Sequence, residues 1–179
     1  MIITVTGKLR ATVGTLTVED TSVPCALGRS GIVPGAEKKE GDGATPAGRW
    51  PLRRLLYRAD RIAAPQSTLP MDAIAPTDGW CDEPEDPLYN QATRLPHPTS
   101  AESLWREDEL YNLCVILGHN DDPVVPHRGS AIFFHVAKQE GTKLCATEGC
   151  VALPQDTLLR VLTNCSPSTV MEILLEDPD

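Results

Sequence analysis

The sequence is short of positive charge, of aromatic residues and of long apolar runs. Its 179 residues carry 16 Lys and Arg against 25 Asp and Glu, a formal net charge of −9. A protein that follows a nucleic-acid backbone or an anionic membrane surface needs a cationic face, so this balance disfavours both partners. The longest apolar runs, at residues 113–117 and 131–134, are far shorter than the roughly 20 residues that a membrane-spanning helix requires. We therefore expect no nucleic-acid partner and no membrane span.

The sequence also gives no sign of export. Polar residues interrupt the apolar ones in MIITVTGKLRATVG, the first segment of the chain, and no basic stretch precedes them as in an export leader. Six cysteines could form three disulfides in a secreted chain, but scattered reduced thiols are the better interpretation here. We expect a cytoplasmic protein, or a periplasmic one if a leader is missing from this sequence.

Composition and patterning predict a β-rich globular protein. Hydrophobic residues at 41% and charged residues at 23% are typical of a packed core, which we expect to form a single domain over residues 1–179. Only 4% of residues are aromatic and 16 are proline, which favours short elements over a helical bundle. Apolar spacing predicts a helix over residues 154–163. Runs rich in Val, Ile and Thr predict strands within residues 2–6, 12–19, 23–28, 113–120, 130–137 and 169–175.

Two stretches are expected to be irregular, residues 31–48 and residues 60–112. The second is too long for an ordinary connection, and long ordered loops tend to shape sites. Its acidic run CDEPEDP, at residues 81–87, lacks the alternating ligands of a calcium loop and is predicted to be a solvated loop. No phosphate-binding loop, serine-hydrolase elbow or His-Glu-x-x-His motif occurs, so no cofactor is implied.

A histidine and a cysteine fifteen residues apart carry the clearest chemistry. His135 ends a predicted strand, and Cys150 lies in the segment Thr-Glu-Gly-Cys. A nucleophilic thiol needs a base to take its proton and a small neighbour so that a carbonyl can approach, and Gly149 is such a neighbour. The backbone N–H of Cys150 would then donate to the oxyanion.

Two other interpretations use the same residues. A histidine that ends an apolar strand is usually structural and a buried cysteine is usually inert, so spacing alone leaves this pair open. The side chains of His127, His135, Cys145 and Cys150 are also ligand types that zinc accepts. Their spacing matches no common finger or ribbon, so the sequence favours no metal site.

Two motifs, in this order, resemble the L,D-transpeptidase catalytic domain (YkuD-type) family. GDGATPAGRW at residues 41–50 looks like that family's Thr-Pro loop. IFFHVA at residues 132–137 and ATEGCVAL at residues 146–153 together resemble its His and Ser/Thr-x-Gly-Cys signature. DGWCDEPEDPLYN and LYNLCVILGHND also look like a compact branch of the family. The resemblance implies a mainly β fold, a β-sandwich with one or two short helices.

The resemblance also implies roles for individual residues. Cys150 would be the nucleophile and His135 the general base. The backbone carbonyl of Val136 would orient the imidazole, and Gly149 would belong to the oxyanion site. The expected substrate contacts are Thr147, His119, Asn120 and Arg128.

Two positions depart from the family pattern. Glu148 stands where many members have a second His, and Ala152 stands where Arg or Asn is common. Thr147 replaces the usual Ser but keeps its hydroxyl. These changes leave the expected nucleophile and base in place and affect the contacts to substrate and acceptor.

The implied reaction is cleavage of the bond between meso-diaminopimelate and the terminal D-Ala of peptidoglycan stem tetrapeptides through a thioester. The implied partners are muropeptides, with carbapenem β-lactams as acylating inhibitors. We favour release by water, as in an L,D-carboxypeptidase of muropeptide recycling, because a cytoplasmic enzyme meets only soluble fragments. The alternative is a periplasmic L,D-transpeptidase that transfers the acyl group to an amine. A non-catalytic fragment binder is disfavoured, because both the cysteine and the histidine are present.

Overall fold

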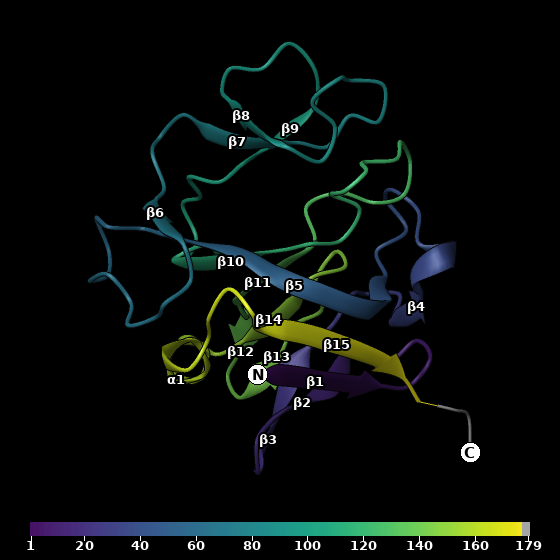
Figure 1. Cartoon of the computed structure of the whole chain (residues 1–179), viewed down its shortest axis with the longest axis vertical. Helices are drawn as coiled ribbons and strands as arrows, with labels where there is room; N and C mark the ends of the chain where they lie inside the picture. The colour runs from purple at the N-terminus through teal and green to yellow at the C-terminus, as the bar shows by residue number, and fades with distance from the viewer. Residues whose placement is uncertain (177–179) are drawn as a thin grey trace.

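The computed structural model describes residues 1–176, whose largest sheet curls round on itself (Figure 1). The order of strands is β10-β11-β14-β3-β2-β1-β15-β5-β4, and β6 is added beside β5. Because β10 pairs with β5 as well as with β11, the sheet closes around one core. Its strands in the described residues are β1 (Ile2–Gly7), β2 (Val13–Val18), β3 (Thr21–Ala26), β4 (Ile32–Pro34), β5 (Thr45–Tyr57), β6 (Met71–Ala73), β10 (Leu113–Leu117), β11 (Phe133–Val136), β14 (Val151–Leu153) and β15 (Val170–Leu175).

Side-chain alternation explains why these segments form strands. In β1 the buried Ile3 and Val5 alternate with polar threonines, the pattern of a strand with one face toward the core. By contrast, β11 and β14 are buried along their whole length and pair in parallel, as in a strand covered on both faces. These two central strands therefore give the site a rigid base.

Smaller elements surround the main sheet. A three-stranded sheet of β7 (Asp78–Cys81), β8 (Ala92–Arg94) and β9 (Ala101–Ser103) lies apart from it, at the top of Figure 1. The short strands β12 (Gln139–Glu140) and β13 (Lys143–Leu144) form a hairpin, and the 3-10 helix η1 covers Gly35–Glu37. The helix α1 (Gln155–Thr163) follows Pro154 and buries Leu158 and Leu162. No helix in residues 1–176 has the length and apolarity to cross a membrane.

The prediction of a mainly β fold is confirmed, whereas the prediction of a loop over residues 31–48 was wrong. Residues 31–48 contain β4, η1 and the start of β5. Residues 60–112 are mostly irregular, as predicted, and contain only the short strands β6 to β9. The acidic run at residues 81–87 is not a solvated loop throughout. Asp86 accepts hydrogen bonds from the Thr99 hydroxyl at 2.6 Å and the Leu88 N–H at 2.8 Å, and it contacts His97 Nε2 at 3.1 Å. These partners come from outside the run, so its own composition could not reveal them.

Candidate active site

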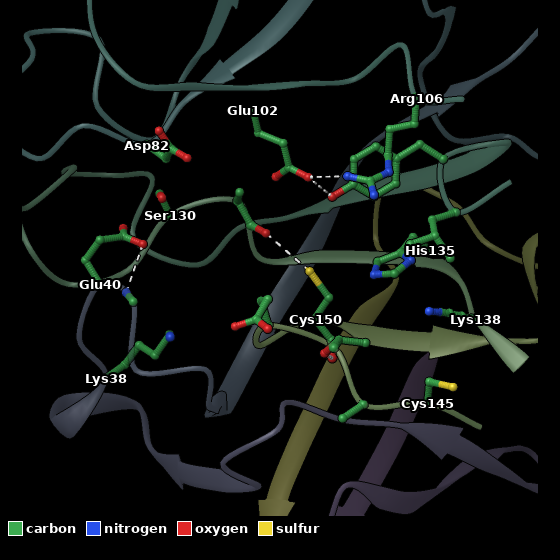
Figure 2. Close-up of a pocket in the computed structure, with 17 residues that line it drawn as sticks. Lys38, Glu40, Asp82, Glu102, Arg106, Ser130, His135, Lys138, Cys145 and Cys150 are labelled. Carbon is green, nitrogen blue, oxygen red and sulfur yellow. Dashed lines mark hydrogen bonds and ion pairs between the residues drawn. The ribbon is translucent and has the colours of Figure 1, made fainter. Parts of the chain in front are cut away.

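The site lies where β11 and β14 run side by side. Phe134 pairs with Val151 and His135 with Ala152, so Cys150 stands at the start of β14, next to β11. The chain between them forms the hairpin of β12 and β13, which explains how a separation of fifteen residues becomes a neighbourhood in space. Figure 2 shows the thiol of Cys150 and the imidazole of His135 beside each other on one wall of a cavity.

The thiol of Cys150 is held by the backbone at the start of β11 and just before it. Its Sγ donates a hydrogen bond to the Ala131 carbonyl at 3.3 Å and accepts one from the Phe133 N–H at 3.3 Å. Cys150 is only 7% exposed, and this burial raises the pKa of its thiol to about 12. The resting side chain is therefore a neutral thiol at pH 7.

The imidazole of His135 is oriented by its neighbour in the chain. Nδ1 lies 2.8 Å from the Val136 carbonyl, which can only accept, so Nδ1 carries the proton and Nε2 is free to take one. The ring of Tyr111 packs edge-on against it, with ring centroids 5.3 Å apart. Burial lowers the pKa of His135 to about 4, so the imidazole is neutral at pH 7.

The turn before Cys150 depends on glycine and on a threonine hydroxyl. Gly149 has φ +135°, and a Cβ there would lie 2.8 Å from the Ala44 carbonyl oxygen. Thr147 Oγ1 donates to the Cys150 carbonyl at 2.7 Å and accepts from the Gly149 N–H at 3.2 Å. Thr45 Oγ1 accepts a hydrogen bond from the Gly28 N–H at 2.8 Å, which anchors the start of β5. Thr45 Oγ1 also lies 3.5 Å from the Cys150 carbonyl oxygen, so the two sequence motifs pack against each other.

Charged groups line the cavity that the thiol faces, whose volume is about 480 Å³. Glu102 accepts a hydrogen bond from the Tyr111 hydroxyl at 2.6 Å and pairs with Arg106 at 3.4 Å. Burial raises the pKa of Glu102, and the charges of Asp82 and Asp108 raise it further. The charged and hydroxyl-bearing lining residues other than Tyr111 are Lys38, Glu40, Asp82, Glu102, Arg106, Ser130, Lys138, Thr147 and Glu148.

The cavity brings one of the four expected substrate contacts to Cys150. Thr147 lines it, whereas His119, Asn120 and Arg128 are not among its lining residues. His119 Nε2 donates to the Arg128 carbonyl at 3.0 Å. The side-chain amide of Asn120 donates to two backbone carbonyls of the following loop. These contacts hold the loop between β10 and β11 and leave the side chain of Arg128 exposed.

Within the described part of the chain, the four residues that the sequence offered as zinc ligands do not form a metal-binding group. His127 instead contacts Glu85 at 2.9 Å, away from the thiol. The group that could hold a metal ion is Cys81, Asp86 and His97, whose ligand atoms lie within 4.8 Å of one another. It belongs to the small sheet and its loops, not to the cavity lining.

The family follows from a comparison over nearly the whole chain. The model of the L,D-transpeptidase catalytic domain (YkuD) matches residues 7–173. The chain belongs to this family. No curated protein and no solved structure matches it. Members of the L,D-transpeptidase family depend on a cysteine and act on peptidoglycan peptides, which assigns this protein to peptidoglycan metabolism.

Much of the cavity wall comes from residues that no motif in the sequence marks. Asp82, Glu102, Arg106 and Tyr111 all come from the segment 60–112 or its end, and Lys38 comes from the other predicted loop. The unusual length of residues 60–112 was a signal that this segment shapes a site. No spacing rule could identify the individual residues, because they meet Cys150 only through the folded chain.

Proposed function

We propose that this L,D-transpeptidase-family protein cleaves the bond between meso-diaminopimelate and D-Ala in stem tetrapeptides, with Cys150 as nucleophile and His135 as general base. The observation that carries the proposal is that a backbone-held thiol and a neutral imidazole, whose Nε2 can accept a proton, line the same cavity. Both groups face the same charged cavity, which gives a peptide access to the thiol.

The proton moves during the attack and not before it. Burial disfavours the charged forms of both side chains, so the resting pair is thiol and imidazole instead of thiolate and imidazolium. As Sγ bonds to the carbonyl carbon, His135 Nε2 takes the thiol proton. The C–N bond then breaks, and D-Ala leaves with that proton on its amine. The product is a thioester on Cys150.

The turn at Gly149 and Cys150 supports the developing oxyanion. Gly149 adopts the φ of +135° that this turn needs and leaves room for the Ala44 carbonyl, and the Cys150 N–H is the natural donor to a carbonyl oxygen above Sγ. The hydrogen bonds of Thr147 to this turn fix its shape before substrate binds. We assign Thr147 a positioning role.

We propose water as the acceptor. An amine must lose its proton before it can attack the thioester, and the carboxylates of Glu40, Asp82 and Glu102 in the cavity stabilise the protonated form. A water molecule is neutral and need not lose a proton before it attacks. His135 Nε2 takes a proton from water as the oxygen attacks, and then returns it to the leaving Sγ, which releases the tripeptide acid. This reaction is that of an L,D-carboxypeptidase acting on muropeptides.

The test is to incubate the purified protein with a disaccharide-tetrapeptide and to identify the products by mass spectrometry. We expect loss of one D-Ala without formation of a dimer. Cys150→Ala should abolish the reaction, whereas the matched Cys25→Ala, in the core away from the cavity, should retain it. Equal turnover by both variants would refute the nucleophile, and a cross-linked dimer would show that an amine is the acceptor.

A carbapenem provides a second readout that does not depend on the acceptor. We expect its mass to be added to Cys150, because opening of the β-lactam by a thiol forms the same kind of thioester. A tryptic map that places the adduct on another of the six cysteines would contradict the proposed site.

A further inference from the structure

One carboxylate of the cavity has no partner. Asp82 lines the cavity, yet its Oδ1 is excluded from solvent and has no hydrogen-bond partner within residues 1–176, and no ion pair there includes Asp82. A charged group that is partly removed from water without compensation costs stability. A protein can retain such a group when a ligand supplies the missing charge.

A second unpartnered group lies on the same wall. Ser130 is 8% exposed and lines the cavity, and its Oγ makes no hydrogen bond of normal geometry although the Tyr89 hydroxyl is near. Figure 2 shows Ser130 between Asp82 and Glu40. An aspartate and a serine hydroxyl together offer acceptors to one donor-rich group.

The charges around Asp82 and Ser130 favour the binding of a cationic ligand group. Glu102 feels the charge of Asp82 across the cavity, so the two carboxylates repel each other when both are ionised. Of the three cations in the lining, Lys38 contacts Asp42, Arg106 contacts Asp108 and Glu102, and Lys138 is exposed to solvent. A positive group from a ligand would relieve the repulsion and pair Asp82 at once.

We propose that Asp82 and Ser130, with the charge of Glu102 facing them, form a binding subsite for a primary ammonium group of the substrate. The inference rests on the proposed function, in which that group is the free amine at the far end of the diaminopimelate side chain of the acyl donor. The ammonium donates to the Asp82 carboxylate and to Ser130 Oγ. The subsite selects donors with a free, protonated amine.

The test is a double-mutant cycle between the protein and the peptide. The kcat/KM of D-Ala release is measured for the tetrapeptide and for the same peptide acetylated on the diaminopimelate amine, with wild type and with Asp82→Asn. We expect acetylation to lower kcat/KM about ten- to a hundredfold in wild type, as for a lost hydrogen bond to a charged group. In Asp82→Asn the two peptides should differ severalfold at most. Asp20→Asn, which removes the same charge from an exposed turn, should behave as wild type.

Thermal unfolding separates a binding role from a structural one. Because Asp82→Asn removes an unpaired charge, its melting temperature should equal or exceed that of wild type. A clear fall in melting temperature, together with equal loss of activity on both peptides, would overturn the subsite. If Asp82→Asn does not fold, the cycle is run with Ser130→Ala, whose smaller loss must still depend on the free amine.

Binding measurements test the proposed subsite separately from the proposed reaction. Dissociation constants of the two peptides are measured by calorimetry with Cys150→Ala and with Cys150→Ala/Asp82→Asn. A preference for the free amine that disappears with Asp82→Asn supports the subsite even if wild type shows no turnover, an outcome that would refute only the proposed function. Turnover by wild type that is indifferent to acetylation would refute the subsite and leave the reaction standing.

Discussion

Protonation of His135 provides a quantitative test of the site, because the burial of the imidazole affects both stability and rate. Its pKa is about 4 in the folded protein, against about 6.5 in an unfolded chain. Because the pKa of His135 is lower in the folded state, the unfolded state binds the proton first as the pH falls. The stabilising contribution is thus present above pH 6.5 or so and is lost as the pH falls toward 4.

The magnitude follows from the shift. A difference of roughly 2.5 pKa units corresponds to about 3 kcal/mol of unfolding free energy, most of it lost between about pH 6.5 and pH 4. By pH 5 the loss relative to pH 7 should already be about 2 kcal/mol. Other groups titrate in the same range, including His119, whose pKa burial also lowers. The effect of His135 must therefore be isolated by comparison with a variant.

Urea unfolding of wild type and of His135→Gln at pH 7 and pH 5 is the appropriate measurement. Glutamine keeps a polar side chain of similar size and does not titrate, so the variant should lose about 2 kcal/mol less than wild type on acidification. In parallel, the acidic limb of the rate of carbapenem acylation should fall near pH 4 in wild type, not near pH 6.5. Equal loss of stability in both proteins would refute the neutral buried imidazole.

Two further predictions concern the turn before the thiol. Gly149→Ala should lower the melting temperature by several degrees, for strain of about 1–3 kcal/mol and contact with the Ala44 carbonyl, and should slow acylation. Gly141→Ala, at φ +61° with open space around it, should keep the wild-type acylation rate. Equal acylation rates in the Gly149→Ala and Gly141→Ala variants would contradict this account. Glu148→Gln breaks an exposed ion pair with Arg29 at 2.7 Å and should change the unfolding free energy by less than about 1 kcal/mol in urea titration. A larger loss would show that Glu148 supports the turn.

The sequence alone determined the features that depend on neighbours in the chain. The Val, Ile and Thr of β1 and the short apolar runs of β10 and β11 predicted strands, because β-branched and apolar side chains pack well on a sheet. The helix after Pro154 was predicted within one residue of its observed bounds. The Gly149-Cys150 turn was recognisable because glycine there serves a local need, a backbone conformation that other residues rarely adopt.

Only the tertiary structure decided the electrostatics of the site. Burial holds Cys150 and His135 neutral, and burial depends on segments far away in the chain that pack over them. The resemblance predicted that His119, which follows β10, touches substrate, but its ring contacts the Arg128 backbone and packs edge-on against Trp50. The sequence predicted that Asp82 belongs to a solvated acidic run, yet it follows β7 and lines the cavity. Such contacts join residues with no regular spacing, so no periodicity in the sequence could report them.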